Sequence, residues 1–381
     1  MKIRYVTSAR MPTTRANGLQ IMKTCEALAS RGVEVELMIP GKNRRTDDLR
    51  DADIFDFYKV KRNFRITPVW VPPAGIFGRK DIFVQDLFFS FVAGMRSIFA
   101  SEGTIMYSRQ PRIVILPLIC GRRAVFESHE GRWSLSVRLA VLFGLRIITI
   151  TRASMNKYLS LGMKEERLAV SPDATDLSLF SNLPTKEECR KIYGIGREDK
   201  VAMYTGSFTS YGWKGLDVFL AASNEVKQPI KFFAVGGRKD EIKKLESDKK
   251  YPNVVFIEQK NQAEIPRLLS AADVLVIPNR KGKEISELHT SPLKLFEYLA
   301  AGRPIVASRL PSLLEIVDEK SAVIVEPNDP QALARGIEKV FTDEKYANIL
   351  AQNSLALSKK YSWEERARGI EEDINKFYER H

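Results

Sequence analysis

The chain has 381 residues, of which 44% are hydrophobic and 28% charged, and its formal net charge is +13. A domain usually holds ~100–200 residues, so this length predicts two domains, and the ordinary composition excludes a mainly disordered protein. The three cysteines lie far apart and form no Cys-x-x-Cys pair, and only three histidines are present. A disulfide framework and a zinc enzyme are therefore disfavoured, and we expect a cytoplasmic protein without a bound metal.

The positive charge is concentrated in the first half of the chain. Residues 1–180 hold 28 Lys and Arg against 17 Asp and Glu, a net +11, whereas residues 181–381 hold 32 against 30, a net +2. A nucleic acid, an anionic membrane surface or a phosphorylated substrate would each explain such an excess, as would a generally basic proteome. We find no nucleic-acid-binding motif and no interleaving of aromatic and basic residues, so no nucleic-acid partner is expected.

Short apolar runs alternate with longer helix-like segments along the whole chain. Nearly continuous apolar strands separated by helices indicate parallel sheets covered on both faces, and one series in each half predicts two doubly wound α/β domains. Turn-forming residues at 171–176 predict the seam between the domains, and a new helix is expected from Thr185 to Tyr193. Strands are predicted at residues 3–7, 33–39, 104–107, 124–127, 146–150, 201–205, 230–235, 254–257, 274–277, 304–307 and 322–325.

Residues 82–99 form the most apolar long stretch and are predicted to be an amphipathic helix. Polar and charged residues interrupt the run, so it is not expected to span a membrane, and the strand-like beginning of the chain predicts no signal peptide. Core packing, a membrane surface and an acceptor groove are all compatible with such a helix. The predicted apolar stripe of this helix, from which Phe83 and Phe89 are left out, comprises Val84, Leu87, Phe88, Phe91, Val92, Met95, Ile98 and Phe99.

A polar segment at residues 43–61 is expected to be a mobile loop of the first domain. It contains Asp51-Ala52-Asp53, a D-x-D triplet of the kind that binds a metal–nucleotide in other enzymes. The triplet lies in a charged run without a neighbouring strand, so we do not interpret it as a metal site.

The most informative segment is residues 289–304. Ser291 is expected to be an N-cap, Pro292 the first helical residue and Gly302 the residue that ends the helix. A helix of about ten residues would then begin at a cluster of unpaired backbone N–H donors, which suits a phosphate. Lys294 would occupy the third helical position, where the helix dipole disfavours a cation by ~0.3–1 kcal/mol unless an anion is bound.

Glu297 lies one turn after Lys294 between apolar neighbours, where a carboxylate is rarely left without partners. It would either pair with Lys294 at i, i+3 or accept hydrogen bonds from vicinal sugar hydroxyls. The residues themselves leave both interpretations open.

Two further segments follow predicted strands. Residues 206–217 join a strand to an amphipathic helix, a context in which phosphates are bound, and Lys214 is predicted to contact an anion there. The spacing is not that of a P-loop, and Arg15-Ala16-Asn17-Gly18, before a helix expected near Leu19, lacks the G-x-G-x-x-G pattern of nicotinamide-binding enzymes. His129 lies just past the end of a buried strand, where doubly wound sheets bind ligands, so we interpret it as functional.

Together these segments resemble glycosyltransferase family 4, the retaining nucleotide-sugar transferases of the GT-B fold. The resemblance implies two Rossmann-like domains that face each other across a cleft. The first (residues 1–176 with a crossover helix at about 364–381) would bind the acceptor, and the second (177–363) the donor. The resemblance is carried by Ala16-Asn17-Gly18, Phe126-Glu127-Ser128-His129, residues 170–176, Thr205-Gly206, Trp213-Lys214-Gly215, residues 291–298, Ala301-Gly302-Arg303-Pro304 and Tyr361-Ser362-Trp363-Glu364.

The family pattern also implies roles for single residues. Glu297 would hold the ribose, and His129 and Lys214 would be catalytic, beside the donor sugar and the pyrophosphate respectively. The remaining assignments are Gly18, Ser207, Ser291 and Lys294 for the pyrophosphate, His289 and Thr290 with His129 for the donor sugar, and Ile257, Glu258 and Gln259 for the loop that edges the base.

Two positions depart from the pattern. His289 stands eight residues before Glu297, where the family has a second glutamate, so Glu287, Glu284 or His289 itself would have to contact the sugar. Ser207 stands where the family often has an arginine, and Lys294 is expected to compensate for the missing cation.

The resemblance implies transfer of a hexose from a nucleotide diphosphate sugar to a saccharide or lipid-linked acceptor, in bacterial surface polysaccharide or glycolipid biosynthesis. It implies no metal and no further cofactor, because lysines and helix N-termini would stabilise the leaving diphosphate. A sugar-nucleotide epimerase or a phosphorylase on the same scaffold is the alternative, followed by a non-enzymatic nucleic-acid-binding protein. The basic first half suits docking on anionic lipid, at the inner face of the membrane.

Overall fold

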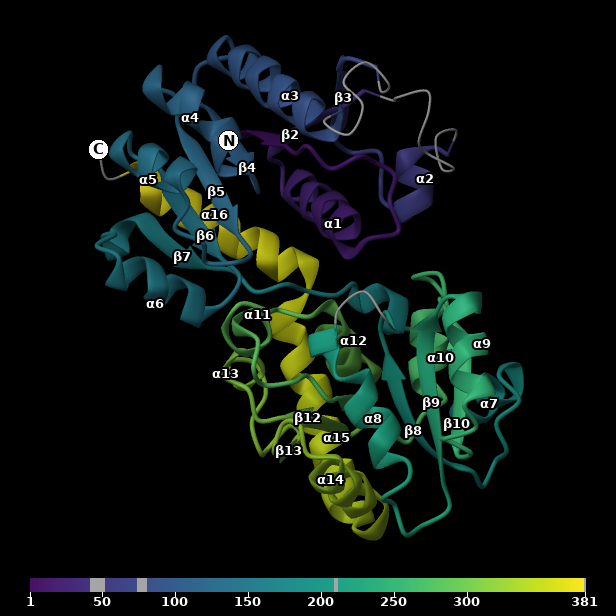
Figure 1. Ribbon diagram of the computed structural model, residues 1–381. Helices are drawn as coiled ribbons and strands as arrows, with labels where there is room; N and C mark the ends of the chain where they lie inside the picture. Colours follow the sequence, from purple (N-terminus) through teal and green to yellow (C-terminus); the bar gives the residue numbers. More distant parts are fainter. Residues whose placement is uncertain (42–51, 74–80, 209–211, 380–381) are drawn as a thin grey trace. The chain divides into compact units, whose positions relative to one another are not determined.

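The computed structural model describes residues 1–41, 52–73, 81–208 and 212–379 (Figure 1). The chain divides into two compact units by its internal contacts. Unit 1 comprises Met1–Pro172 and Trp363–His381, and unit 2 comprises Asp173–Ser362. Each unit holds one parallel sheet, of seven and six strands respectively, so the predicted α/β class is confirmed.

Unit 1 is built on a sheet with the strand order β3-β2-β1-β4-β5-β6-β7, in which every neighbouring pair is parallel. The five inner strands were predicted from the sequence, whereas both edge strands were missed. β3 contains Pro68 and β7 has only three residues, features that are tolerated at a sheet edge and weaken a sequence signal. The strands are β1 (Lys2–Val6), β2 (Glu34–Pro40), β3 (Arg65–Val69), β4 (Thr104–Ser108), β5 (Ala124–Ser128), β6 (Arg146–Thr149) and β7 (Leu168–Val170).

The helices of unit 1 cover this sheet. Phe89, Ile113, Val137 and Tyr158, from four successive helices, belong to one buried core cluster on one face of the sheet. The first and last helices of the unit pack on each other. The helices are α1 (Ala16–Ser30), α2 (Ile54–Tyr58), α3 (Asp81–Ile98), α4 (Pro111–Ile119), α5 (Leu135–Leu142), α6 (Arg152–Ser160) and α16 (Trp363–Glu379).

Helix α3 does not bury the face that its apolar periodicity predicted. Leu87 and Phe91, from the predicted stripe, are exposed, whereas Phe89, which the prediction left out, is fully buried. The buried face is otherwise made of small or polar residues: a Cβ on Gly94 would lie 3.6 Å from the carbonyl oxygen of Ile113, so α4 approaches α3 closely. No helix in the described part of the chain has both the length and the apolar character needed to cross a membrane.

Unit 2 has a sheet with the order β10-β9-β8-β11-β12-β13, again parallel throughout, and all six strands were predicted. The strands are β8 (Lys200–Thr205), β9 (Ile230–Gly237), β10 (Val254–Glu258), β11 (Val274–Ile277), β12 (Ile305–Ser308) and β13 (Val323–Val325). The helices are α7 (Lys186–Ile192), α8 (Leu216–Ala222), α9 (Lys239–Ser247), α10 (Ile265–Ser270), α11 (Glu284–Leu288), α12 (Leu293–Ala301), α13 (Pro311–Leu314), α14 (Pro330–Thr342) and α15 (Glu344–Ser358). The predicted new helix is α7, which Thr185 caps in a capping box with Glu188.

Arg366 anchors the C-terminal helix α16 inside unit 1. Its guanidinium donates hydrogen bonds to Glu127 Oε2 (2.9 Å), Thr24 Oγ1 (3.0 Å) and the carbonyl of Pro172 (2.9 Å). The side chains of Arg366 and Glu127 are each only 3% exposed. Further along the helix, the Tyr378 hydroxyl donates to the carbonyl of Ala124 (2.8 Å), so α16 lies against β5 over several turns.

We expect Arg366→Met to lower the free energy of unfolding by roughly 3–5 kcal/mol, because it leaves the buried Glu127 carboxylate without its closest cation. Arg368→Met is the matched control: Arg368 lies on the same helix but pairs with Glu365 and Glu372 at the surface. Such exposed pairs contribute only ~0–1 kcal/mol. Chemical denaturation of both variants measures the difference, and equal losses would contradict the structural role given to Arg366.

Candidate functional site

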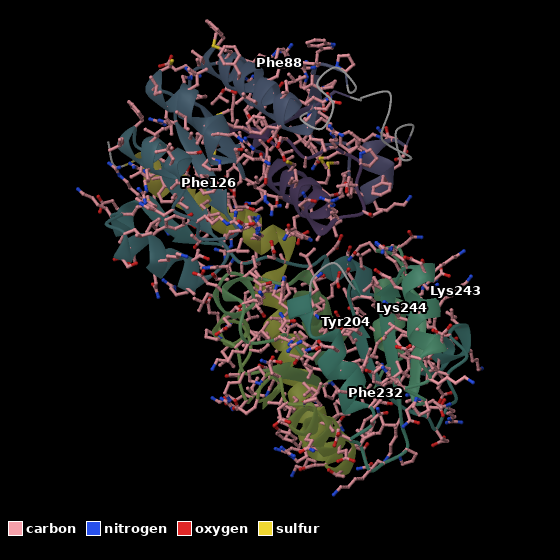
Figure 2. All side chains as sticks on the ribbon, viewed as in Figure 1. Phe88, Phe126, Tyr204, Phe232, Lys243 and Lys244 are labelled. Carbon is pink, nitrogen blue, oxygen red and sulfur yellow. The ribbon has the colours of Figure 1, made fainter. Side chains whose placement is uncertain are left out.

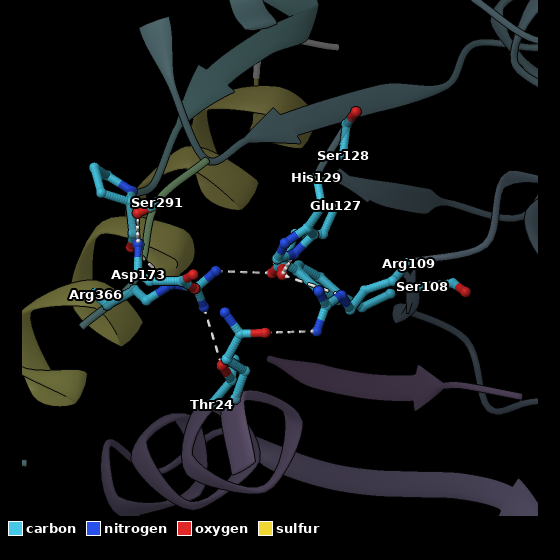
Figure 3. Close-up of polar contacts among 12 residues, drawn as sticks. Thr24, Ser108, Arg109, Glu127, Ser128, His129, Asp173, Ser291 and Arg366 are labelled. Carbon is cyan, nitrogen blue, oxygen red and sulfur yellow. Dashed lines mark hydrogen bonds and ion pairs between the residues drawn. The ribbon is translucent and has the colours of Figure 1, made fainter. Parts of the chain in front are cut away.

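His129 follows directly after β5, at the carboxyl end of a central strand of unit 1. Its Nε2 lies 2.6 Å from Glu127 Oε1, and its side chain is 18% exposed. Figure 3 shows Glu127 between His129, Arg109 and Arg366. Ligands of doubly wound sheets bind at this edge.

Glu127 is a buried carboxylate that remains ionised. Burial alone would raise the pKa of Glu127, but Arg366, His129 and Arg109 outweigh it and hold the pKa well below its usual range. The Arg109 Nε lies 3.8 Å from Oε1, and the Tyr107 hydroxyl donates a hydrogen bond to Oε2. Both carboxylate oxygens are therefore occupied by groups of unit 1.

This network determines the protonation state of His129. Burial, together with the charge of Arg109, lowers the pKa of His129 to about 4, so the ring is neutral at pH 7. A neutral ring beside an ionised carboxylate must carry its proton on Nε2, because that nitrogen faces Glu127. Nδ1 then keeps its lone pair and can accept a hydrogen bond from a hydroxyl group.

The loop between β1 and α1 differs from the sequence expectation. α1 begins at Ala16, not near Leu19, so Gly18 lies inside its first turn. A Cβ on Gly18 would lie 2.1 Å from the Tyr58 hydroxyl oxygen, so close packing of Tyr58 explains the glycine without a ligand. The proposed contact of Gly18 with phosphate stays a prediction.

In unit 2, the loop between β8 and α8 is held against the end of β11. Gly215 has a φ of +73°, and a Cβ on it would lie 1.8 Å from the carbonyl oxygen of Pro278, so no other residue fits there. This contact fixes Lys214 just before α8. Burial lowers the pKa of the Lys214 ammonium.

The start of α12 lies one residue later than predicted. The helix begins at Leu293 with Pro292 in the N-cap position, so Pro292 is not its first residue and Lys294 is the second. Ser291 is not the cap: its Oγ accepts a hydrogen bond from the backbone N–H of Asp173 (2.9 Å). Gly302 ends the helix with a φ of +58°, as expected.

Lys294 points inward from this helix start. Its ammonium nitrogen is enclosed, has no hydrogen-bond partner among the described residues, and lies 4.3 Å from the ring centroid of Tyr204. Burial, and then the charge of Lys214, lower the pKa of Lys294 well below its usual range. Enclosed polar groups without partners are uncommon and mark a place where a ligand or water belongs.

Glu297 does not pair with Lys294, so that alternative is wrong. Its Oε1 accepts a hydrogen bond from Gln262 Nε2 (2.6 Å), and burial raises its pKa. The Tyr298 hydroxyl oxygen accepts a hydrogen bond from the backbone N–H of Thr205 (2.8 Å), and this bond joins α12 to the end of β8. Lys294, Glu297 and the loop with Lys214 are thus positioned by one set of contacts at the carboxyl edge of the sheet.

The remaining site residues predicted in unit 2 lie in or after β10, after β8 and just before α12. Ile257 and Glu258 belong to β10, and only Gln259 follows the strand, three residues before Gln262. His289 is buried, with its Nε2 3.2 Å from Glu284 Oε1. Thr290 is buried and Ser207 half-buried.

The other candidate groups named from the sequence have structural partners or lie outside the described residues. Glu287 Oε1 accepts a hydrogen bond from the N–H of Gly282 (2.8 Å). Asp53 caps α2 and pairs with Arg62, whereas Asp51 of the D-x-D triplet lies outside the described residues.

Four site residues had escaped the sequence analysis: Arg109, Arg366, Gln262 and Tyr204. None belongs to a motif. Arg109 and Arg366 contact Glu127 in unit 1, whereas Gln262 and Tyr204 contact Glu297 and Lys294 in unit 2. Glu127 carried a usable signal, because a carboxylate within an otherwise apolar strand has to find a cation.

Comparison with known proteins adds a family to this geometry. Residues 199–343, within unit 2, match the family model described as Glycosyl transferases group 1. This stretch is therefore similar to the domain of that family. The chain is also 24% identical over 234 residues to an uncharacterised glycosyltransferase of Methanocaldococcus jannaschii, which covers 58% of each chain.

The chain is 24% identical over 212 residues to the putative colanic acid biosynthesis glycosyl transferase WcaI of Escherichia coli, covering 53% of this chain and 51% of that one. It thus spans about half the length of the curated relatives it matches. A crystal structure of HepE from Anabaena in complex with UDP matches 98% of this chain and all of that chain, with a TM-score of 0.76 and 16% identity. The fold is that of the GT-B glycosyltransferases, as predicted.

We expect nuclear magnetic resonance to find His129 as the neutral Nε2–H tautomer at pH 7. Because its pKa of about 4 lies below the ordinary value, its ¹⁵N shifts should stay constant while the pH falls to 5. Only His129, His289 and His381 are present, so His129→Asn assigns the signal. The unfolded chain takes up this proton near pH 6.5, so His129 makes stability fall as the pH drops from about 6.5 towards 4, a component that the variant should lack. An Nδ1–H tautomer would contradict the network.

Proposed function

We propose that this protein is a retaining glycosyltransferase that moves a hexose from a nucleotide diphosphate sugar to a saccharide or lipid-linked acceptor. The observation that carries the proposal is the pair Lys214 and Lys294 at the carboxyl edge of the unit 2 sheet. The ammonium of Lys294 is enclosed without a described partner, and the charge of Lys214 further disfavours its charged form. A bound diphosphate would give the Lys294 ammonium a hydrogen-bond partner and would offset its repulsion from Lys214.

The surroundings of Lys294 favour a nucleotide over a simple anion. Glu297 lies one helical turn on, and only Gln262 among the described residues contacts its carboxylate. In our proposal Glu297 accepts hydrogen bonds from the vicinal hydroxyls of the ribose, while Lys214 and Lys294 bind the diphosphate. The loop around Gln259 then lies on the side of the base.

The proposed chemistry rests on charge stabilisation of the leaving group. A nucleoside diphosphate leaves with its negative charge growing on the bridging oxygen, and preorganised ammonium and N–H groups are most effective against such a charge. In our proposal the two lysines and the start of α12 supply these groups without a metal ion. Nδ1 of His129 accepts a hydrogen bond from a sugar hydroxyl and so orients the donor. Retention by front-face attack requires no pair of carboxylates of the glycosidase kind.

The relatives support a pathway and a first ligand. WcaI is described as a colanic acid biosynthesis transferase, and HepE was crystallised with UDP. We therefore propose a role in surface polysaccharide or glycolipid assembly and take UDP as the first nucleotide to test.

Thermal unfolding with UDP, GDP and ADP, each paired with its nucleoside, tests the donor site. A ligand at ~100 times its dissociation constant stabilises the folded state by about 2.7 kcal/mol, which raises the melting temperature by several degrees. We expect one diphosphate to do so, and Glu297→Gln to lose most of that shift. If no diphosphate shifts the wild type, the nucleotide-sugar proposal fails. Conversion of the matching nucleotide sugar without any acceptor would point to an epimerase.

Lys294→Met distinguishes a role of Lys294 in binding the diphosphate from a role in the stability of the fold. Because it removes an enclosed cation without a partner, we expect the ligand-free variant to melt a few degrees above the wild type. The same variant should bind the nucleoside diphosphate at least tenfold more weakly and the nucleoside about equally well. Lys243→Met, on the exposed lysine of α9 labelled in Figure 2, is the control and should change neither quantity. Equal losses for nucleoside and diphosphate would refute the role of Lys294.

A further inference from the structure

The outer sides of α3, α4 and α5 in unit 1 are apolar. We call this surface the apolar face and define it by seven side chains that are between 40% and 77% exposed. They are Phe83, Leu87 and Phe91 of α3, Ile119 of α4, and Leu135, Leu139 and Leu142 of α5. On α3 and on α5 they recur every three or four residues, so each helix presents a stripe.

The stripes belong to one continuous layer. α3 packs on α4 and α4 on α5, and the inner sides of all three helices share one core cluster above the sheet. Trp70, which is 66% exposed, follows β3 and packs edge-on against Phe88 of α3, with ring centroids 5.5 Å apart. Phe88 is labelled in Figure 2. Trp70 thus extends the apolar face at the side of α3.

The long helices α14 and α16 have no such apolar stripe among their described exposed residues. The exposed residues of α16 include Glu364, Arg368, Glu372 and Lys376, and those of α14 include Arg335 and Lys339. Soluble proteins rarely expose contiguous apolar surfaces, and those that do use them for docking. The apolar face therefore has an occupant.

The charge of unit 1 around the apolar face favours an anionic occupant. Arg138 on α5 lies on the side of Leu142, is exposed and forms no ion pair with a described carboxylate. The nearby acid Asp86 is already paired with Arg112. Residues 1–180 carry a net charge of +11, which a second copy of the chain would double and anionic headgroups would neutralise. Apolar side chains interspersed with arginines and an exposed tryptophan are typical of helices that lie in a membrane interface.

We propose that the apolar face docks unit 1 onto an anionic lipid bilayer. α3 and α5 lie along the surface with Leu87, Phe91, Leu139 and Leu142 in the acyl boundary, and Arg138 contacts headgroups. Trp70 lies at headgroup level. The proposal stands independently of the proposed transferase activity, because it uses no residue of the candidate site.

Flotation of the full-length protein with lipid vesicles tests the proposal. We expect it to float with phosphatidylcholine vesicles that contain 30% phosphatidylglycerol, and at least tenfold less with phosphatidylcholine alone. Leu87→Ser/Phe91→Ser should reduce binding at least tenfold without changing the net charge. The matched control is Ile349→Ser/Leu355→Ser, which removes two comparably exposed apolar residues (47% and 48%) from α15 of unit 2 and should bind like the wild type.

Two further measurements make the result decisive. Arg138→Gln should weaken the preference for anionic vesicles more than Arg96→Gln, because Arg96 lies on the side of α3 opposite to Leu87. Brominated lipids should quench wild-type tryptophan fluorescence more than that of Trp70→Phe. The replaced side chains are exposed, so circular dichroism should show folded variants throughout. Equal binding to neutral and anionic vesicles, or equal loss in the α15 control, would overturn the proposal. So would a wild-type dimer in sedimentation that Leu87→Ser/Phe91→Ser dissolves while vesicles bind neither protein.

Discussion

The ion pair between Arg366 and Glu127 connects the architecture of unit 1 with its candidate site. The two side chains are 239 positions apart in sequence and almost fully buried. A buried ion pair is weak evidence for stability, because apolar residues of similar volume would often pack α16 at least as well. What the ions add is chemical: an ionised Glu127 keeps the proton of His129 on Nε2 and leaves Nδ1 as an acceptor. The last helix of the chain thus helps to set the protonation of a residue that follows β5.

The buried Lys294 of unit 2 is in the opposite situation to Glu127. Glu127 of unit 1 is surrounded by partners, whereas the ammonium of Lys294 has none among the described residues and has Lys214 as a neighbour. Contact with the ring of Tyr204 offsets only part of that cost, since a cation–π contact contributes ~0.5–2 kcal/mol. The Lys294 ammonium destabilises the ligand-free protein and is stabilised when an anion binds. Such a site selects ligands by their negative charge. The unsatisfied cation is therefore the strongest structural argument for the proposed diphosphate site.

The sequence was sufficient for features that depend on local patterns. The inner strands, the new helix from Thr185 and the glycine that ends α12 follow from composition and spacing over a few residues. It was insufficient where distant groups compete. β3 and β7 are edge strands with weak patterns, and Ser291 turned away from its helix because the N–H of Asp173 offered another bond. Glu297 found Gln262, a residue 35 positions away that no motif includes.

Helix α3 is another case in which contacts with a distant part of the chain decided what the local sequence pattern could not. Apolar periodicity identified the helix but left open whether its stripe packs in the core, lies on a membrane surface or lines an acceptor groove. Close contact with α4 instead demanded small side chains at Ala93 and Gly94, which left Leu87 and Phe91 outside. An apolar stripe that the core does not use, on a unit with an excess of positive charge, is the surface that we propose for docking. The two units use cations differently: Lys214 and Lys294 of unit 2 lie close enough for the charge of one to disfavour that of the other, whereas unit 1 pairs its buried Arg366 with Glu127 and exposes other arginines, among them Arg138.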